Sequence, residues 1–296
     1  MVPYNLSDFM ITSALAIIMM GIGLSLTFAD FKNIFLYPKA LIIALSVQLA
    51  IIPSIAFLIA AISGLSDGAK VGIVIISACA SGASSNLITH LFKGNVALAI
   101  SMTTINSLLT VFWVPFIVDL ALSAFMGRTA GITLDFWDTA FQIFAIILIP
   151  ATLGMVIRAI KPGIAFKLET PLKYILPLIL ASVFSIKLFG GEKIGGTEIT
   201  FSEGWEILPW CLLLNILAIL SGFIIARLFK LNFKNQFTVS IEVGLHNTTL
   251  ALLIAGTILK IPEMEKPAVI YAMFSFFTSV ISVFILKKLF ITEIEN

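Results

Sequence analysis

The stretch SIEVGLHNTTLALLIAG, residues 240–256, carries three polar side chains in the middle of an otherwise apolar segment. Glu242, His246 and Asn247 lie close together, and Gly244 separates the acid from the imidazole. Burying an ionised carboxylate is strongly unfavourable unless it is paired and hydrogen-bonded. Glycine and asparagine also weaken a helix interior. We therefore expect a helix that is interrupted near Gly244, with functional groups at the break.

The composition of the whole chain places this stretch in a membrane. Of the 296 residues, 59% are hydrophobic and 11% are charged, with a net charge of +2, and the mean hydropathy is +1.11. Soluble domains carry about 25% charged residues. Continuous apolar runs long enough for a helix to cross a bilayer recur along the chain, unlike the alternating pattern of a β-barrel. We predict an all-α polytopic membrane protein.

We expect about nine membrane spans, joined by short loops that leave no room for a second soluble domain. One integral membrane domain would then cover residues 1–296, with an N-terminal half at 1–130 and a C-terminal half at 131–296. The predicted spans are 6–27, 39–62, 70–92, 96–123, 136–158, 171–189, 206–227, 235–259 and 267–287.

The loop charges predict the orientation. Twelve of the 18 Lys and Arg residues fall on one side of the nine spans, and six fall on the other. Because cytoplasmic loops carry an excess of Lys and Arg, the richer side is predicted to be cytoplasmic. This puts the N-terminus outside and the C-terminus inside, in a multi-pass protein of the cell inner (plasma) membrane.

The third span resembles the eighth in having a polar, helix-weakening centre. It contains CASGASSN, residues 79–86, where small and polar side chains replace leucine. The two spans are five apart, so they run in opposite directions, and each follows a span with a lone amide, Gln48 or Asn215. Paired interrupted spans in two inverted halves point to a transporter's binding site at the midplane. We predict two crossing discontinuous helices.

The polar groups at these breaks suit a hard cation. One carboxylate, Glu242, would stand among neutral oxygens, which is the ligand type that such cations prefer, whereas zinc would require more His or Cys. His246 could be a ligand, a proton carrier or a packing residue. Half-helix N-termini after Asn86 and Asn247 would favour an organic anion. For that substrate we expect Ser84, Asn247 and Thr248 to provide contacts.

Two motifs resemble the bile acid:sodium symporter family, and similar spacing extends over nearly the whole chain. They are CASGASSNLITHLFKGNVALAISMTT, residues 79–104, and SIEVGLHNTTLALLIA, residues 240–255. The resemblance implies a core domain with the two crossing helices, a panel domain that moves against it, and sodium-coupled symport of organic anions. Bile-acid-like molecules and small carboxylates such as pantoate or pyruvate are the implied substrates.

The resemblance also implies ligands for one or two sodium ions. For the first ion they are Ser85, Asn86, Thr103 and Glu242, and for the second they are Gln48, Glu242, Val243, Leu245 and His246. Two positions depart from the family pattern. Ala99 stands where a further serine is usual, and His246 stands where a glutamine is usual.

Two alternatives remain open at this point. Histidine titrates near neutrality, so a proton carried by His246 could replace a sodium ion. Alternatively, Glu242 and His246 could belong to an intramembrane metal-dependent enzyme, although the main expectation is a carrier without catalytic residues or an organic cofactor. The expected partners are an organic anion and the lipid bilayer, without nucleic acid, and the carrier is predicted to work as a monomer.

Overall fold

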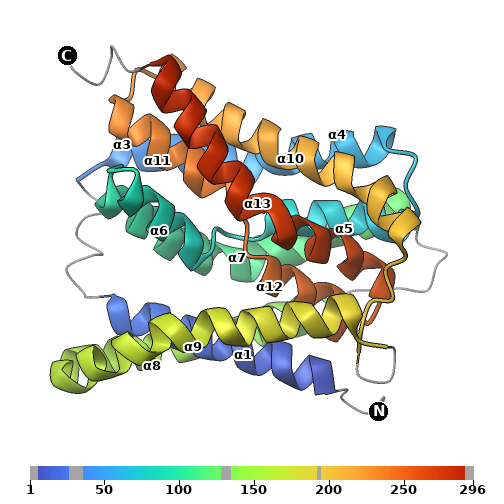
Figure 1. Ribbon diagram of the computed structural model, residues 1–296, viewed down its shortest axis with the longest axis horizontal. Helices are drawn as coiled ribbons and strands as arrows, with labels where there is room; N and C mark the ends of the chain where they lie inside the picture. The colour runs from blue at the N-terminus through green and yellow to red at the C-terminus, as the bar shows by residue number, and fades with distance from the viewer. Residues whose placement is uncertain (1–5, 27–35, 128–134, 192–194, 291–296) are drawn as a thin grey trace.

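The computed structural model describes residues 6–26, 36–127, 135–191 and 195–290, and these segments are helical apart from short connections (Figure 1). The helices begin at α1 and end at α13, and two π-helical turns, η1 and η4, continue neighbouring helices. Their bounds are α1 (Leu6–Ser25), α3 (Pro38–Ser46), η1 (Val47–Ile51), α4 (Ile52–Ile62), α5 (Asp67–Ala78), α6 (Ala83–Leu91), α7 (Val96–Phe125), α8 (Phe136–Ile160), α9 (Pro162–Phe189), α10 (Phe201–Leu228), α11 (Phe233–Gly244), α12 (Thr248–Leu252), η4 (Leu253–Ile258) and α13 (Pro262–Leu289).

The all-helical membrane fold is confirmed. Within the described residues, five unbroken helical segments are long and apolar enough to cross a bilayer: Pro38–Ile62, Val96–Phe125, Phe136–Ile160, Phe201–Leu228 and Pro262–Leu289. Each matches a predicted span. Helix α9 (Pro162–Phe189) contains the sixth predicted span, 171–189, and starts before it. Helical hydrogen bonding does not depend on hydropathy, so a helix continues past the apolar residues.

Polar residues at the loop ends start several of these helices. Asn95 caps α7 by accepting from Leu98 N at 3.1 Å, and Asn232 caps α11 by accepting from Asn235 N at 2.9 Å. Thr200 forms a capping box with Glu203 at the start of α10. Such side chains satisfy backbone N–H groups that have no partner inside the helix.

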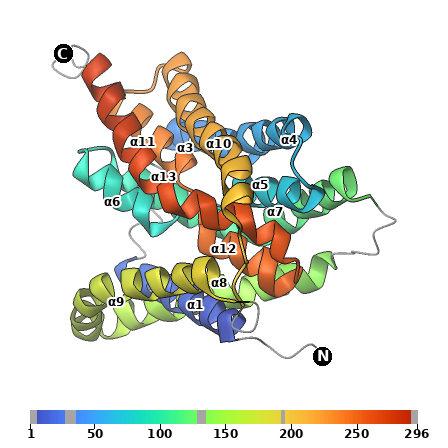
Figure 2. The same ribbon diagram turned by 45° about the vertical axis from the view of Figure 1, so that its right-hand side comes forward.

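Three helices form a body of their own. Helices α1, α8 and α9 lie together below the rest in Figures 1 and 2. Helices α1 and α8 approach closely because both carry glycine at the contact. A Cβ on Gly23 would lie 2.0 Å from Ala151 O, and one on Gly154 would lie 2.3 Å from Met20 O. We call α1, α8 and α9 the panel, and α3–α7 with α10–α13 the core.

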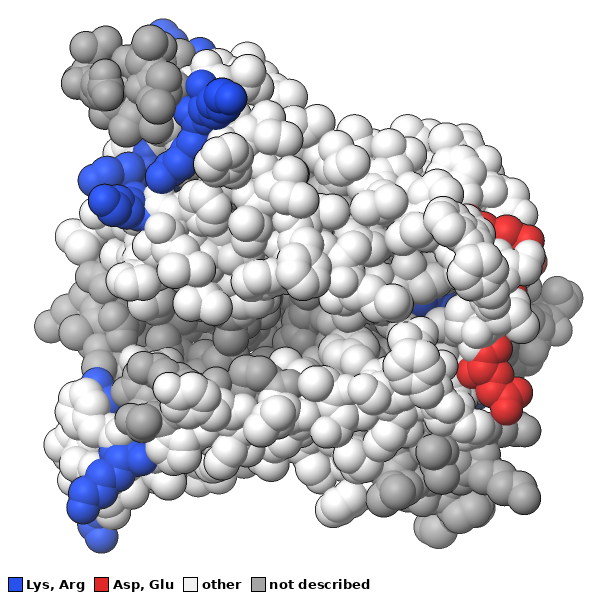
Figure 3. All heavy atoms as spheres, in the orientation of Figure 1, with Lys and Arg blue, Asp and Glu red and all other residues white. Residues whose placement is uncertain are grey.

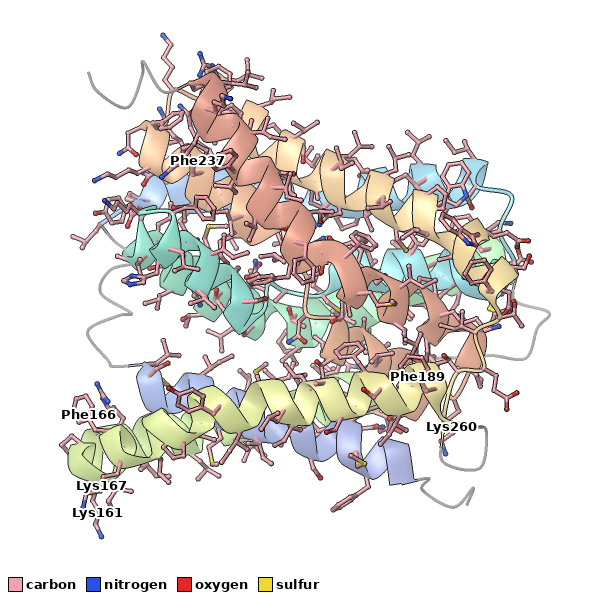
Figure 4. All side chains as sticks on the ribbon, in the orientation of Figure 1. Lys161, Phe166, Lys167, Phe189, Phe237 and Lys260 are labelled. Carbon is pink, nitrogen blue, oxygen red and sulfur yellow. The ribbon has the colours of Figure 1, made fainter. Side chains whose placement is uncertain are left out.

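Charges gather at the two ends of the molecule. Figure 3 shows most of the blue Lys and Arg atoms of this face at one end and the red acidic atoms at the other, where a small blue patch lies beside them. Lys161 and Lys167 lie at the basic end, and Lys260 lies at the opposite end (Figure 4). The sequence assigned Lys161 and Lys167 to one side of the spans and Lys260 to the other, and their positions at opposite ends agree with that assignment.

Candidate functional site

The two interrupted spans meet at their breaks. Helix α5 ends at Ala78 and Cys79 is extended, while α11 ends at Gly244 and Leu245 is extended. Ser81 and His246 form an isolated antiparallel bridge, and Asn247 N donates to Ala80 O at 2.8 Å. Each unwound segment thus satisfies part of the other's backbone, which irregular backbone inside a bilayer requires. The prediction of two crossing discontinuous helices is confirmed.

Glu242 lies at this crossing with no exposed surface. Its Oε2 accepts from Ser81 Oγ at 2.5 Å and from Thr103 Oγ1 at 3.0 Å. Its Oε1 has no hydrogen-bond partner within the part of the chain that the structure describes. One carboxylate oxygen is therefore held in place, and the other is available to a ligand.

The residues predicted for the first ion are gathered around this carboxylate. Asn86 Nδ2 donates to Thr103 Oγ1 at 3.4 Å, and Asn86 Oδ1 is buried without a hydrogen-bond partner among the described residues. Ser85 is buried and donates to Gly82 O at 2.7 Å. Ala99, also buried, is one helical turn before Thr103 on α7.

Two of the residues predicted for the second ion, Gln48 and His246, meet at one backbone carbonyl. Gln48 Nε2 donates to Cys79 O at 3.4 Å, and His246 Nδ1 lies 3.3 Å from the same oxygen. A carbonyl only accepts, so Nδ1 carries the proton, and in the neutral ring Nε2 then offers a lone pair. Gln48 Oε1 and His246 Nε2 are both buried and unpartnered in the described structure. The buried residues Val243 and Leu245 flank the end of α11.

The structure places the start of one half-helix earlier than predicted, and the three predicted substrate residues differ in exposure. Helix α6 begins at Ala83 and not after Asn86, because Gly82 is extended and ends the unwound segment. Ser84 is exposed, whereas Asn247 and Thr248 are half-buried. Asn247 Oδ1 accepts from Leu250 N at 3.0 Å, so this side chain caps α12.

A cavity of about 270 Å³ lies between the panel and the core beside the first ion's residues. Asn86, Thr103, Thr104 and Ser107 line its core wall, and α1 and α8 form its panel wall. Ser84, Asn247 and Thr248 are not among the lining residues. The lining residues lie in the C-terminal half of α1, from Met19 on, and of α8, from Ile147 to Met155. Helix α8 leads to Lys161 at the basic end, so the cavity lies toward that half of the molecule.

Sequence reasoning did not select Ser81, although its hydroxyl makes the shorter of the two contacts with Glu242. The available signal was its place in CASGASSN, where every small polar residue is a candidate. The conformation of the unwound backbone at Cys79, Ala80 and Gly82 determines which serine hydroxyl of this stretch points toward Glu242. Contacts over a separation of 161 residues depend on how the spans pack.

Comparison with known proteins identifies the family. The model of the Sodium Bile acid symporter family matches residues 12–194, which is more than half of the chain. The chain belongs to this family. The matched range includes the third span, whereas Glu242 lies beyond it. The relatives below are described as a sodium-dependent transporter or as cotransporters of sodium with bile acids or metabolites.

Relatives are found in bacteria, plants and animals. An uncharacterized sodium-dependent transporter of Bacillus subtilis is 30% identical over 83% of this chain and 73% of its own length. A probable chloroplastic sodium/metabolite cotransporter of rice is 27% identical over 80% of this chain, which spans 56% of the rice protein. The rat hepatic sodium/bile acid cotransporter is 29% identical over 86% of this chain and 68% of its own length.

Proposed function

We propose that this protein is a secondary active symporter that couples inward movement of sodium to uptake of an organic anion. The observation that carries the proposal is the buried Glu242 at the helix crossing. Among the described residues, its Oε1 has no hydrogen-bond partner, and the same holds for two further buried oxygens, Asn86 Oδ1 and Gln48 Oε1. Oxygen atoms of one carboxylate and neutral amides fit a hard cation of low charge. Membership of a family of sodium-dependent transporters supports this choice.

The cation and the anion would act together. Sodium at Glu242 compensates a buried negative charge, which otherwise opposes an anion nearby. The panel then moves against the core so that the site faces each side of the membrane in turn. The cavity between panel and core supports this proposal, and its position toward the basic end corresponds to an inward-facing state if that end is cytoplasmic.

The substrate we propose is a small carboxylate such as pyruvate or pantoate, rather than a bile acid. The cavity of about 270 Å³ is below the roughly 300–1,000 Å³ that is typical of drug-sized ligand sites. Its polar lining comes from neutral groups, Asn86, Thr103, Thr104, Ser107 and other hydroxyls. This preference is tested by measuring how unlabelled pyruvate, pantoate and taurocholate inhibit the uptake of a labelled carboxylate. Strong inhibition by taurocholate alone would contradict a preference for small carboxylates.

Uptake into proteoliposomes tests sodium coupling. Wild-type protein should accumulate the carboxylate only with an inward sodium gradient, and Glu242→Gln should abolish this uptake because a neutral amide cannot compensate the cation. Glu206→Gln makes the same chemical change at an exposed position on α10 and should leave uptake unchanged. Sodium-driven uptake that survives in Glu242→Gln would remove the basis of the proposal.

A proton coupled through His246 is the second candidate, favoured by its buried Nε2, which has no hydrogen-bond partner in the described segments. In this case a pH gradient should drive uptake in sodium-free buffer, and His246→Gln should remove that uptake. If His246→Gln instead lowers the sodium concentration needed for half-maximal uptake, the histidine occupies a weakened second sodium site. Within the described residues, no three His, Cys, Asp or Glu side chains are grouped, and stoichiometric zinc bound to the purified protein would favour the metal-dependent enzyme instead.

A further inference from the structure

Each interrupted span ends its first half-helix beside a buried amide from the preceding span. Gln48 Nε2 in η1 donates to Ser77 O at 3.3 Å and to Cys79 O at 3.4 Å, at the end of α5. Asn215 Nδ2 in α10 donates to Gly244 O at 2.8 Å, at the end of α11. The last carbonyls of a helix have no partner within it. In each of the two inverted halves, the amide donates a hydrogen bond to such a carbonyl.

The two amides differ in their oxygens. Gln48 Oε1 is buried without a partner in the described segments, and it remains available to a cation. Asn215 Oδ1 accepts from Thr278 Oγ1 of α13 at 2.6 Å. Asn215 is fully buried, and its amide is engaged at both ends. The amide of the N-terminal half, Gln48, therefore keeps an oxygen that can bind a cation. The amide of the C-terminal half, Asn215, uses both its nitrogen and its oxygen in hydrogen bonds within the protein.

Tyr271 completes the arrangement around Gly244. Its hydroxyl donates to Gly244 O at 2.8 Å and accepts from Asn215 Nδ2 at 2.9 Å. Two donors occupy both lone pairs of this carbonyl, so it is not a ligand. Gly244 also lies so close to α10 that a Cβ there would be 2.3 Å from Ile219 Cγ1. The end of α11 is thus fixed from α10 and from α13.

We propose that Asn215, Tyr271 and Thr278 are positioning residues for the second cation site. Their hydrogen bonds fix the position of Gly244 O and therefore the backbone conformation of the neighbouring residues. Those neighbours are Val243 and Leu245, which the family resemblance assigns as ligands of the cation. The Tyr271 ring also packs against His246, with ring centroids 5.7 Å apart. This inference rests on the proposed sodium symport and assigns the geometry of its second site to residues that do not touch the ion.

Two subtle variants test the proposal in the full-length protein. Tyr271→Phe removes only a hydroxyl, and Thr278→Val replaces a hydroxyl by a methyl group and frees Asn215 Oδ1. In proteoliposomes, the sodium concentration for half-maximal uptake should rise roughly fivefold in each, the effect expected for one lost hydrogen bond. The maximal rate at saturating sodium should be kept, because the ion's own ligands are intact.

Matched controls separate positioning from packing. Tyr174→Phe makes the same change on a side chain of α9 that is 73% exposed, and Thr278→Ser keeps the hydroxyl. Both should retain the wild-type sodium dependence. An unchanged half-saturating sodium concentration in Tyr271→Phe and Thr278→Val, with a melting temperature lowered equally with and without sodium, would overturn the positioning role. Wild-type uptake that ignores sodium would instead refute the symport itself.

Discussion

Ser81 provides the most direct support for the functional carboxylate. Its hydroxyl donates to Glu242 Oε2 at 2.5 Å from the opposite unwound segment, and both residues are buried. Thr103 donates to the same oxygen at 3.0 Å and also lies within 3.4 Å of the Ser81 hydroxyl. Two hydroxyls thus orient one carboxylate oxygen, and the other, Oε1, has no hydrogen-bond partner among the described residues and is available to the proposed cation.

Replacing this serine should weaken cation binding. In Ser81→Ala, we expect the half-saturating sodium concentration to rise about tenfold, since a hydrogen bond to a charged group contributes roughly 1.5–3 kcal/mol. Uptake at graded sodium concentrations measures the shift. Ser202→Ala, at an exposed position of α10, is the matched control. Equal sodium dependence in both variants would show that Thr103 alone orients the carboxylate.

At the scale of elements, the interrupted helices depend on close backbone approach. Gly222 of α10 and Gly244 of α11 face one another's helices. A Cβ on Gly222 would lie 2.5 Å from Val243 Cγ2, and one on Gly244 would lie 2.3 Å from Ile219 Cγ1. The sequence marks Gly244 as a helix breaker, but its second role, contact with α10, follows only from packing.

Gly244→Ala should therefore destabilise the protein by overpacking. The expected cost is about 1–3 kcal/mol, visible as a lower melting temperature of the purified protein in detergent. Gly163→Ala, where no atom lies within 4 Å of the new Cβ, should leave the melting temperature unchanged. Adding Ile219→Ala to Gly244→Ala removes the clashing atom and should recover part of the loss. A melting temperature that stays low in the double variant would indicate a requirement for glycine at the break itself.

At the scale of the whole molecule, a buried ion pair joins the panel to the core. Lys187 of α9 pairs with Glu265 of α13, and both are buried. Glu265 also packs against η4, where a Cβ on Gly256 would lie 2.0 Å from its Oε1. A second pair, Lys266 with Glu203, lies nearby but is partly exposed. The sequence predicted neither pair.

These two pairs should respond differently to mutation. Lys187→Met leaves Glu265 without this cation and should cost about 3–5 kcal/mol, as for other broken buried pairs. Lys266→Met should cost less than about 1 kcal/mol, because solvent screens an exposed pair. Thermal unfolding in detergent measures both. Combining Lys187→Met with Glu265→Gln should recover most of the loss, and a further loss in the double variant would contradict the pairing.

The predicted orientation can be tested with single cysteines. Lys161→Cys and Lys260→Cys place thiols at exposed positions on opposite ends of the molecule. A membrane-impermeant maleimide added to intact cells should label residue 260 but reach residue 161 only after lysis. Cys79 and Cys211 have no exposed surface and should not react. The reverse labelling pattern would place the N-terminus inside.

The sequence by itself determined the membrane class, the two interrupted spans and Glu242 as the central group. These features are local: apolar runs of helix length, small polar residues at two span centres, and an acid that apolar surroundings cannot accept without partners. Apart from Ser81, the site residues brought together at the crossing were also named from the sequence, through its motifs and their family resemblance, although their roles stay predictions.

Only the tertiary structure decided which groups are held and which are available. It distinguishes Gln48, with a buried unpartnered oxygen, from Asn215, whose oxygen binds Thr278. It also groups α1 with α8 and α9, although more than a hundred residues separate α1 from α8 in the chain. Both outcomes depend on contacts between distant segments. Such contacts follow from the packing of whole helices, which local patterns of residues do not specify.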